Sequence, residues 1–241
     1  PYGPAELVGR RLLPPGQGHP LGTDELGRDV LSRIVYGARV SLYVGVIAVG
    51  LASLLGGLLG VLAGYVGGWL DGALTALIDI LLAFPGLVLA IVIAGLLGPS
   101  ITNAMVAIGI ISTPVYARIA RTAVVVVKSE LYVDAARVVG GGAAHIIRQH
   151  ILPNIAAPLI VQTSLLFSTA VLAEAALSFL GLGIQPPDPS WGSMLNGSRR
   201  FMETAPWLAI APGFSIMLVV LGFNFLGDGM RDALDPRLRQ V

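Results

Sequence analysis

Long stretches without a charged residue divide this chain into blocks of membrane-spanning length. One of them runs from residue 40 to residue 70. A helix crosses the hydrocarbon core of a bilayer with about 20 mostly apolar residues. The pattern therefore predicts five membrane-spanning helices, at residues 42–66, 73–97, 102–127, 155–181 and 207–227.

The composition agrees with a chain that lies mostly in lipid. Hydrophobic residues make up 55% of the 241 residues and charged residues only 12%, about half of the roughly 25% that is usual in soluble proteins. Too few polar residues remain to cover five apolar helices in water. We therefore predict an all-α fold, a polytopic membrane helix bundle. The net charge of +1 gives no electrostatic basis for binding nucleic acid.

The first predicted span carries small residues at a regular interval. Gly56, Gly60 and Gly64 follow one another at intervals of four residues, which places them on one face of a helix. Small residues on such a face let two helix backbones approach closely in lipid. The stripe indicates either a seam along which two helices can slide or ordinary close packing, and the two interpretations are compatible.

The polar segments define the rest of the organisation. Residues 1–38 are predicted as an extracytoplasmic segment with an amphipathic helix, residues 39–228 as the membrane domain, and residues 229–241 as a cytoplasmic tail. Within the membrane domain, residues 128–153 form a cytoplasmic loop and residues 184–206 an external loop. This orientation places eight of the fifteen Lys and Arg residues on the cytoplasmic side, a mild bias in the direction of the positive-inside rule.

The cytoplasmic loop, residues 128–153, has the pattern of two short helices joined at a glycine corner. Ser129 is a candidate N-cap for the first helix, because a serine side chain accepts a hydrogen bond from the first turn. The run Gly140–Gly142 is expected to end that helix, because glycine adopts left-handed backbone angles at little cost. A second helix is expected to stop before Pro153. The loop is therefore predicted to be a compact knob.

A motif with a characteristic spacing lies within this loop. It consists of Asp134, Ala135, Ala136, Gly140, Leu152 and Pro153. Residue types and spacing closely resemble the Glu-Ala-Ala…Gly…Leu-Pro loop of binding-protein-dependent ABC importer permeases, with Asp134 in the place of the glutamate. Further stretches are similar to the second membrane subunit of dipeptide, oligopeptide and nickel importers, so that the resemblance covers almost the whole chain. These stretches are residues 22–29, 83–86, 150–154, 173–183 and 189–192.

The resemblance implies a type I ABC importer permease in the cytoplasmic (inner) membrane of a bacterium or an archaeon. Such a permease pairs with a second permease subunit and works with a cytoplasmic ATPase, and an extracytoplasmic substrate-binding protein delivers the cargo. Family members normally carry six spans. We therefore expect one further span N-terminal to residue 1.

The resemblance also implies candidate site residues. The resemblance implies that the loop docks into a groove of the ATPase. The coupling residues expected there are Asp134, Ala135, Ala136, Arg137, Gly140, Leu152 and Pro153. Val133, Ala136 and Val139 would offer an apolar face, while Asp134 and Arg137 would make the polar contacts. The candidate residues for contact with the binding protein are Asp24, Glu25, Arg28 and Asp29.

The chain lacks the residues with which it could drive transport itself. Its only lysine is Lys128, and no Gly-x-x-x-x-Gly-Lys loop surrounds it, so ATP and Mg²⁺ are expected on the partner ATPase. His145 and His150 are five residues apart, which would place them off a common helix face, and we expect no metal site. We therefore predict a translocation subunit that is not an enzyme and binds no cofactor of its own.

Two acidic residues lie within or beside the predicted spans. An ionisable group in a membrane costs a few kcal/mol and usually faces a cavity or a partner. Asp79 is expected near the cytoplasmic end of its helix, where it can reach the interface or bond to a neighbouring helix. Glu174 is a candidate for the translocation path or for a proton relay, and a structural role is an equal alternative.

The leading hypothesis is the membrane subunit of an ATP-driven importer of dipeptides or oligopeptides, coupled to its ATPase through residues 128–153. A nickel importer of the same type is the first alternative, because the resemblance covers both cargoes. A proton-coupled secondary transporter that uses Asp79 and Glu174 would take up its substrate without an ATPase. A purely structural membrane scaffold would leave the spacing between Gly140 and Pro153 unexplained.

Overall fold

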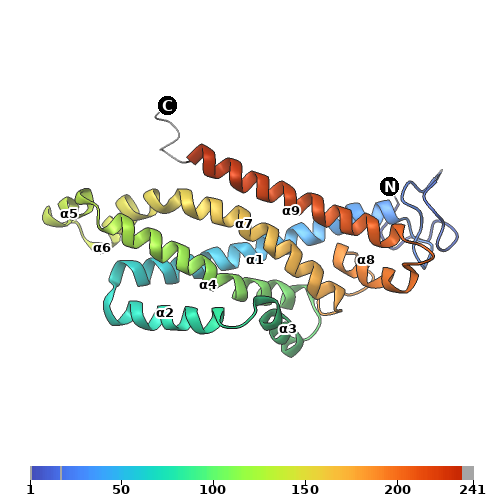
Figure 1. Cartoon of the computed structure of the whole chain (residues 1–241), viewed down its shortest axis with the longest axis horizontal. Helices are drawn as coiled ribbons and strands as arrows, with labels where there is room; N and C mark the ends of the chain where they lie inside the picture. Colours follow the sequence, from blue (N-terminus) through green and yellow to red (C-terminus); the bar gives the residue numbers. More distant parts are fainter. Residues whose placement is uncertain (1, 17, 235–241) are drawn as a thin grey trace. The chain divides into compact units, whose positions relative to one another are not determined.

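The computed structural model describes residues 2–16 and 18–234 of the chain. All regular elements of this part are helices (Figure 1), as the sequence predicts. The long helices are α1 (Val30–Val66), α4 (Ile101–Lys128), α7 (Leu152–Phe179) and α9 (Trp207–Leu234). The shorter elements are α2 (Gly68–Leu82), α3 (Gly86–Leu97), α5 (Leu131–Val138), α6 (Ala143–Ile146), the π-helical turn η1 (Ile147–Ile151), α8 (Trp191–Ser198) and the 3-10 turn η2 (Arg199–Phe201).

Four helical stretches of the described chain are long and apolar enough to cross a membrane. They are Val30–Val66, Ile101–Lys128, Ala143–Phe179 and Trp207–Leu234. Helices α2 and α3 pass the same test only as a pair, and they are bent by 87° at the break between them. Counted as one broken span, the pair brings the number to five.

Three predicted elements differ in detail from the structure. The residues predicted as one span at 73–97 are two helices, because Pro85 has no N–H to continue the helical hydrogen bonds and disfavours helical angles in the residue before it. The amphipathic helix and the first span, predicted as separate, are the single helix α1. The predicted tail at 229–241 begins inside α9, and its residues 235–241 lie outside the described residues.

The chain divides into two compact units. Unit 1 comprises Pro1–Ala48, Leu87–Ile108 and Phe167–Gly222. Unit 2 comprises Val49–Gly86, Gly109–Leu166 and Phe223–Val241.

Unit 1 contains a folded segment at residues 184–206, which the sequence predicts as an external loop. Val30, Ala205 and Leu208 form a buried apolar cluster. The indole N–H of the buried Trp191 donates to the carbonyl oxygen of Ile34 at 3.1 Å. These contacts fix the predicted loop at residues 184–206 against the first turns of α1, so that this segment is ordered by burial of apolar side chains rather than left as a free connection.

In unit 2 the glycine stripe of α1, Gly56, Gly60 and Gly64, lies against α4. A Cβ atom added at Gly60 would lie 2.6 Å from the Cβ of Ala120, and one added at Gly64 would lie 2.9 Å from the Cβ of Val124. Both distances are too short for real Cβ atoms, so the two backbones approach this closely only because glycine has no side chain. The predicted close helix–helix seam is confirmed.

Ion pairs also join α2 to α4 in unit 2. Arg121 Nε and Nη2 donate to the two carboxylate oxygens of Asp71 at 2.5 and 2.6 Å. Asp79 pairs with Arg118. Asp79 therefore bonds to a neighbouring helix, one of the two environments that the sequence predicts for it.

Candidate coupling site

The candidate coupling loop lies in unit 2, between the end of α4 and the start of α7 (Figure 1). The chain turns directly after Lys128, and α5 begins at Leu131. The predicted N-cap is wrong: Glu130 is the N-cap residue of α5 and makes no side-chain capping bond. The hydroxyl of Ser129 instead donates to the carbonyl oxygen of Val126 at 2.8 Å. Ser129 therefore closes the end of α4 rather than the start of α5.

The glycine corner ends α5 as predicted. Gly140 has a φ of +88°, and the N–H of Gly141 donates to the carbonyl oxygen of Ala136 at 2.9 Å. An added Cβ at Gly141 would lie 2.7 Å from that same oxygen, whereas one at Gly140 would meet no atom within 4 Å. Gly140 is therefore required by its backbone angle, and Gly141 by a close approach of two backbone segments.

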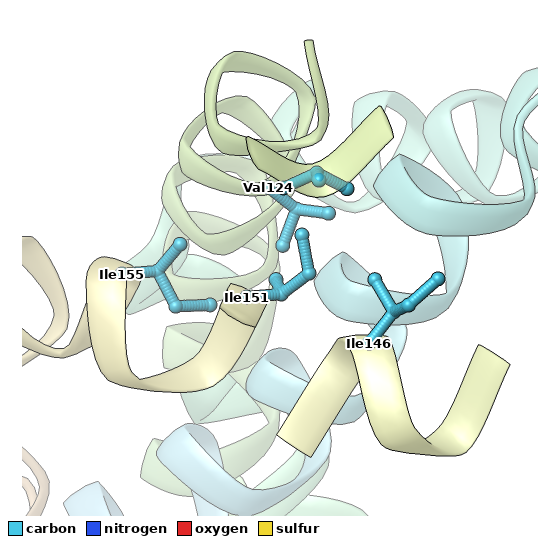
Figure 2. Packing of buried hydrophobic residues seen from close by; sticks show 5 residues of the cluster. Val124, Ile146, Ile151 and Ile155 are labelled. Atoms are coloured by element: carbon cyan, nitrogen blue, oxygen red, sulfur yellow. The ribbon is translucent and has the colours of Figure 1, made fainter. Parts of the chain in front are cut away.

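A buried apolar cluster anchors both arms of the loop. Its members, each with 1% or less of its surface exposed, are Val124, Val133, Ile146, Ile151 and Ile155. Figure 2 shows the side chains of Val124, Ile151 and Ile155 next to one another, with Ile146 beside them. Since these residues come from α4, α5, α6, η1 and α7, the cluster fixes the loop to both of the helices that it connects. The predicted compact knob is confirmed.

The outer surface of the loop carries exposed apolar side chains. Leu131, Val138 and Val139 expose 85%, 86% and 84% of their surfaces. Val133 was expected on this surface, but it is fully buried in the anchoring cluster. It occupies the inner side of α5, five residues before Val138, and helical geometry turns these two valines to different sides.

The polar motif residues of the loop lie at the same surface. Arg137 Nη1 donates to the carboxylate of Asp134 at 2.7 Å across one helical turn. Arg137 exposes 38% and Asp134 58% of its side chain, so this pair adds little to stability and is accessible to a partner. Ala135 is exposed and Ala136 half-buried. Such a surface combines apolar side chains with a charged pair on a rigid support.

Leu152 and Pro153 do not end a helix, in contrast to the prediction. The π-helical turn η1 passes directly into α7 at Leu152, and Pro153 is the second residue of α7. Proline is tolerated in a first helical turn, where its missing N–H removes no bond that the helix needs. The Asn154 side chain donates to the carbonyl oxygen of His150 at 2.6 Å. Both motif residues are exposed.

The same π-helical turn corrects the prediction for the two histidines. The ring centroids of His145 and His150 are 5.9 Å apart, and that of Tyr132 is 6.1 Å from His150. The hydrogen bonds of a π-turn join residues five apart rather than four, and with this wider turn His145 of α6 and His150 of η1 lie near one another. Over the part of the chain that the structure describes, no group of three or more His, Cys, Asp or Glu side chains is arranged to hold a metal ion.

Sequence reasoning missed the structural role of Lys128. Its ammonium group donates to the carbonyl oxygen of Tyr65 at 2.5 Å and lies 5.6 Å from the centre of the Tyr65 ring. A cation at the last carbonyls of a helix is favourable, and Tyr65 stands one residue before the end of α1. The position of the only lysine in the last turn of α4 was the available signal.

Three of the four candidate residues for contact with the binding protein are buried within unit 1. Asp24, Arg28 and Asp29 expose 5%, 9% and 3% of their surfaces. Arg28 Nε donates to Asp24 at 2.6 Å, and the N–H of Arg28 donates to the same carboxylate at 2.9 Å. Only Glu25 keeps a partly exposed side chain, at 33%. These residues therefore hold the N-terminal segment together, and Glu25 is the accessible one.

Asp29 fixes the start of α1. Its carboxylate accepts the N–H and the hydroxyl of Ser32, each at 2.8 Å, and pairs with His19 Nδ1 at 3.0 Å. Burial by itself raises the pKa of Asp29, but the hydrogen bonds from Ser32 and His19 outweigh it and hold the pKa below its ordinary value. Asp29 is thus a charged N-cap residue.

Glu174 lies in the packed interior of unit 1, with 2% of its surface exposed. It accepts the hydroxyl of Ser41 from α1 at 2.8 Å and that of Ser178 from α7 at 2.7 Å. No basic side chain pairs with it among the described residues. These contacts favour a structural role, because they join two helices within the subunit.

The helices and the loop define a polytopic membrane bundle with a rigid knob between two of its spans. The family described as "Binding-protein-dependent transport system inner membrane component" matches residues 56–240, and the chain belongs to this family. The family thus supports the resemblance seen in the sequence.

Relatives match over nearly the whole chain. The chain is 52% identical to the dipeptide transport system permease protein DppC of Escherichia coli (strain K12), over 100% of this chain and 82% of that protein. It is 52% identical to the protein of the same name from Alkalihalophilus pseudofirmus, over 95% of this chain and 75% of that protein. It is 44% identical to the glutathione transport system permease protein GsiD of Escherichia coli O6:K15:H31, over 93% of this chain and 74% of that protein.

A solved structure has the same fold. A chain of the methionine ABC transporter MetNI, in an inward-facing crystal form, superposes with a TM-score of 0.72 at 18% identity, over 85% of this chain and 97% of that chain. The chain is accordingly a multi-pass inner-membrane permease component that works with an ATPase and a substrate-binding protein. ATP hydrolysis belongs to the partner ATPase.

Proposed function

We propose that this chain is the membrane subunit through which short peptides, dipeptides above all, are imported. Relatives at 52% identity carry the name of dipeptide transport permeases, which supports this cargo over nickel. A second, different permease subunit completes the path, and the extracytoplasmic N-terminal segment receives the binding protein, with Glu25 as its accessible carboxylate.

Coupling to the ATPase runs through the loop at residues 128–153. The observation that carries this proposal is the separation of its two faces: Val133 and Ile151 are buried in the anchoring cluster, while Leu131, Val138 and Val139 are exposed. Exposed apolar groups on a rigid support are typical of a protein–protein contact. Because both arms are anchored to α4 and α7, a push on the loop is transmitted to these helices.

Replacing Gly140 by leucine tests the coupling. A side chain at Gly140 meets no atom of this chain within 4 Å, so the substitution costs only the backbone penalty of about 1–2 kcal/mol for a left-handed residue. Gly98 is a matched control, because it has the same φ of +88° and equally open surroundings but lies between α3 and α4.

The complete transporter is reconstituted in vesicles, and ATP-driven uptake of a labelled dipeptide is measured with the binding protein present and the proton gradient abolished. We expect the Gly140→Leu transporter to assemble and to lose uptake, and the Gly98→Leu transporter to retain it. Equal uptake by both variants would refute coupling through the loop. Uptake that appears only when a proton gradient is restored, and without ATP, would support a secondary transporter instead.

A further inference from the structure

A polar cavity of about 260 Å³ lies within unit 1, among residues that transport coupling does not use. Its walls come from three places: the N-terminal segment, the first turn of α1, and the stretch from the end of α7 through α8. The residues that matter for its chemistry are Glu25, Arg28, Arg33, Asp188, Asn196 and Gly197. A volume of this size lies below the roughly 300–1,000 Å³ of sites for drug-sized ligands, so only a smaller molecule fits.

Two buried arginines supply donors to this cavity. Arg28 and Arg33 expose 9% and 7% of their surfaces, yet each guanidinium has five N–H donors and few protein acceptors. Arg28 Nε is bonded to Asp24, and Arg33 Nη1 donates to the carbonyl oxygen of Pro4 at 2.8 Å. Arg28 Nη2 is 3.5 Å from Glu25, and Arg33 Nε is 3.5 Å from Asp24.

Arg28 and Arg33 both line the cavity. A donor buried without an acceptor costs about 1–3 kcal/mol, and among the described residues the only fully buried side-chain nitrogen or oxygen without a partner is Trp207 Nε1. Each guanidinium nitrogen of Arg28 and Arg33 is therefore either bonded or not fully buried, and both side chains border the cavity. Arginine N–H groups form strong, charge-assisted hydrogen bonds with a carboxylate.

Acidic groups line the same space. Glu25 and Asp188 border the cavity, and Asp24 forms an ion pair with Arg28. Counting these three carboxylates against Arg28 and Arg33 leaves one negative charge in excess. A simple anion is therefore disfavoured, whereas a ligand that carries both a carboxylate and an ammonium group meets a partner for each.

We propose that this cavity binds the zwitterion of a free amino acid or a dipeptide. The carboxylate of the ligand bonds to the free donors of Arg28 and Arg33, and its ammonium group lies toward Glu25 and Asp188. The choice of a peptide as ligand rests on the proposed function. The cavity is a site of the permease itself, separate from the substrate-binding protein.

Replacing Gly197 of α8 by valine is a way to fill part of the cavity, because Gly197 is one of its lining residues. A Cβ added there would lie 3.7 Å from Glu25 Oε1, an ordinary contact, and the branches of a valine would extend into the space beyond it. Gly213 of α9, in the same unit, is a matched control because an added Cβ meets no atom within 4 Å. Both are helical glycines, so the change of helix propensity is similar.

The test measures binding of labelled L-alanyl-L-alanine to the assembled transporter in lipid nanodiscs, without the binding protein. We expect saturable binding that Gly197→Val weakens at least tenfold and Gly213→Val changes less than twofold. N-acetyl-L-alanyl-L-alanine amide, which has neither terminal charge, should compete at least tenfold more weakly. Should Gly197→Val fail to assemble, Asn196→Ala serves in its place, because it removes an amide from the wall and should weaken binding at least threefold.

Three results would overturn the inference: no saturable binding to the wild-type transporter, unchanged affinity in the variant with the altered wall, or equal competition by the blocked peptide. Uptake of the same dipeptide, driven by ATP with the binding protein present, is measured in parallel. Uptake without direct binding would refute the cavity site and leave the proposed function intact. Absence of uptake by the complete transporter would refute the proposed function.

Discussion

Two valines of α5 allow the anchoring of the coupling loop to be separated from its outer surface. Val133 is fully buried, and Val138 in the same helix exposes 86% of its surface. The substitution to alanine is chemically identical at the two positions. Any difference in stability between Val133→Ala and Val138→Ala therefore reports burial in the anchoring cluster.

The expected magnitude follows from the buried carbon atoms. Val133→Ala removes two of them, worth about 0.8 kcal/mol each or about 1.6 kcal/mol together, and a residual cavity adds to this loss. The better helix propensity of alanine offsets about 0.5 kcal/mol. The net loss is about 1.5–2.5 kcal/mol for Val133, whereas Val138→Ala should be neutral or slightly stabilising.

Amide hydrogen exchange of the loop in the assembled transporter measures this difference. Local opening limits the exchange of α5 and α6 amides, and each 1.4 kcal/mol corresponds to a factor of ten. Val133→Ala should therefore speed the exchange of these amides about 10- to 60-fold. Val138→Ala should leave exchange unchanged and weaken the binding of the ATPase, because it removes exposed apolar contact surface.

The reverse pattern would refute the proposed division of the loop. If Val133→Ala leaves exchange unchanged, the cluster does not anchor α5. If ATPase affinity falls for Val133→Ala but stays the same for Val138→Ala, the exposed side of α5 is not the docking surface.

Two further predictions concern unit 1. Because the folded-state pKa of Asp29 lies below its ordinary value, its bonds stabilise the N-terminal segment above the ordinary aspartate value of about 3.9. This contribution is lost as the pH falls through the folded-state pKa; limited proteolysis around Asp29 should therefore accelerate in acid, and Asp29→Asn should remove that dependence. Glu174→Gln retains an acceptor for Ser41 and should preserve assembly and ATP-driven uptake, while Glu174→Ala should destabilise the subunit by about 1–3 kcal/mol for each hydroxyl left without a partner. Loss of uptake by an intact Glu174→Gln transporter would support a proton relay.

The helical membrane fold could be predicted because its signals are repeated along the chain. Each span needs about 20 mostly apolar residues, so errors of several residues at the boundaries do not alter the fold class. The glycine stripe at Gly56, Gly60 and Gly64 was equally readable, since intervals of four residues on a helix have one geometric meaning. Its partner, α4, could not be named, because small-residue spacing on one helix carries no information about which neighbour approaches it.

The fine structure of the coupling loop could not be predicted, because it depends on contacts between segments. Helix α5 has eight residues, and Val133, Val138 and Val139 are chemically alike; only the positions of α4 and α7 decide that Val133 faces inward. The π-helical turn before Pro153 likewise depends on tertiary contacts and not on the local sequence alone. It brings His145 and His150 together, although a regular α-helix with the same sequence would separate them.

Gly98 and Gly140 show why a single residue does not define a functional site. Both have a φ of +88°, and both have open space where a side chain would stand, so the local requirement for glycine is the same at the two turns. The difference lies in the support, because Gly140 follows a helix whose inner valine is held by the cluster around Ile151. A force applied at Gly98 acts only on the turn between α3 and α4. A force applied at the Gly140 turn is transmitted to α4 and α7 through the packed side chains of the anchoring cluster. The coupling role therefore rests on the anchoring cluster as much as on the glycine that the motif identifies.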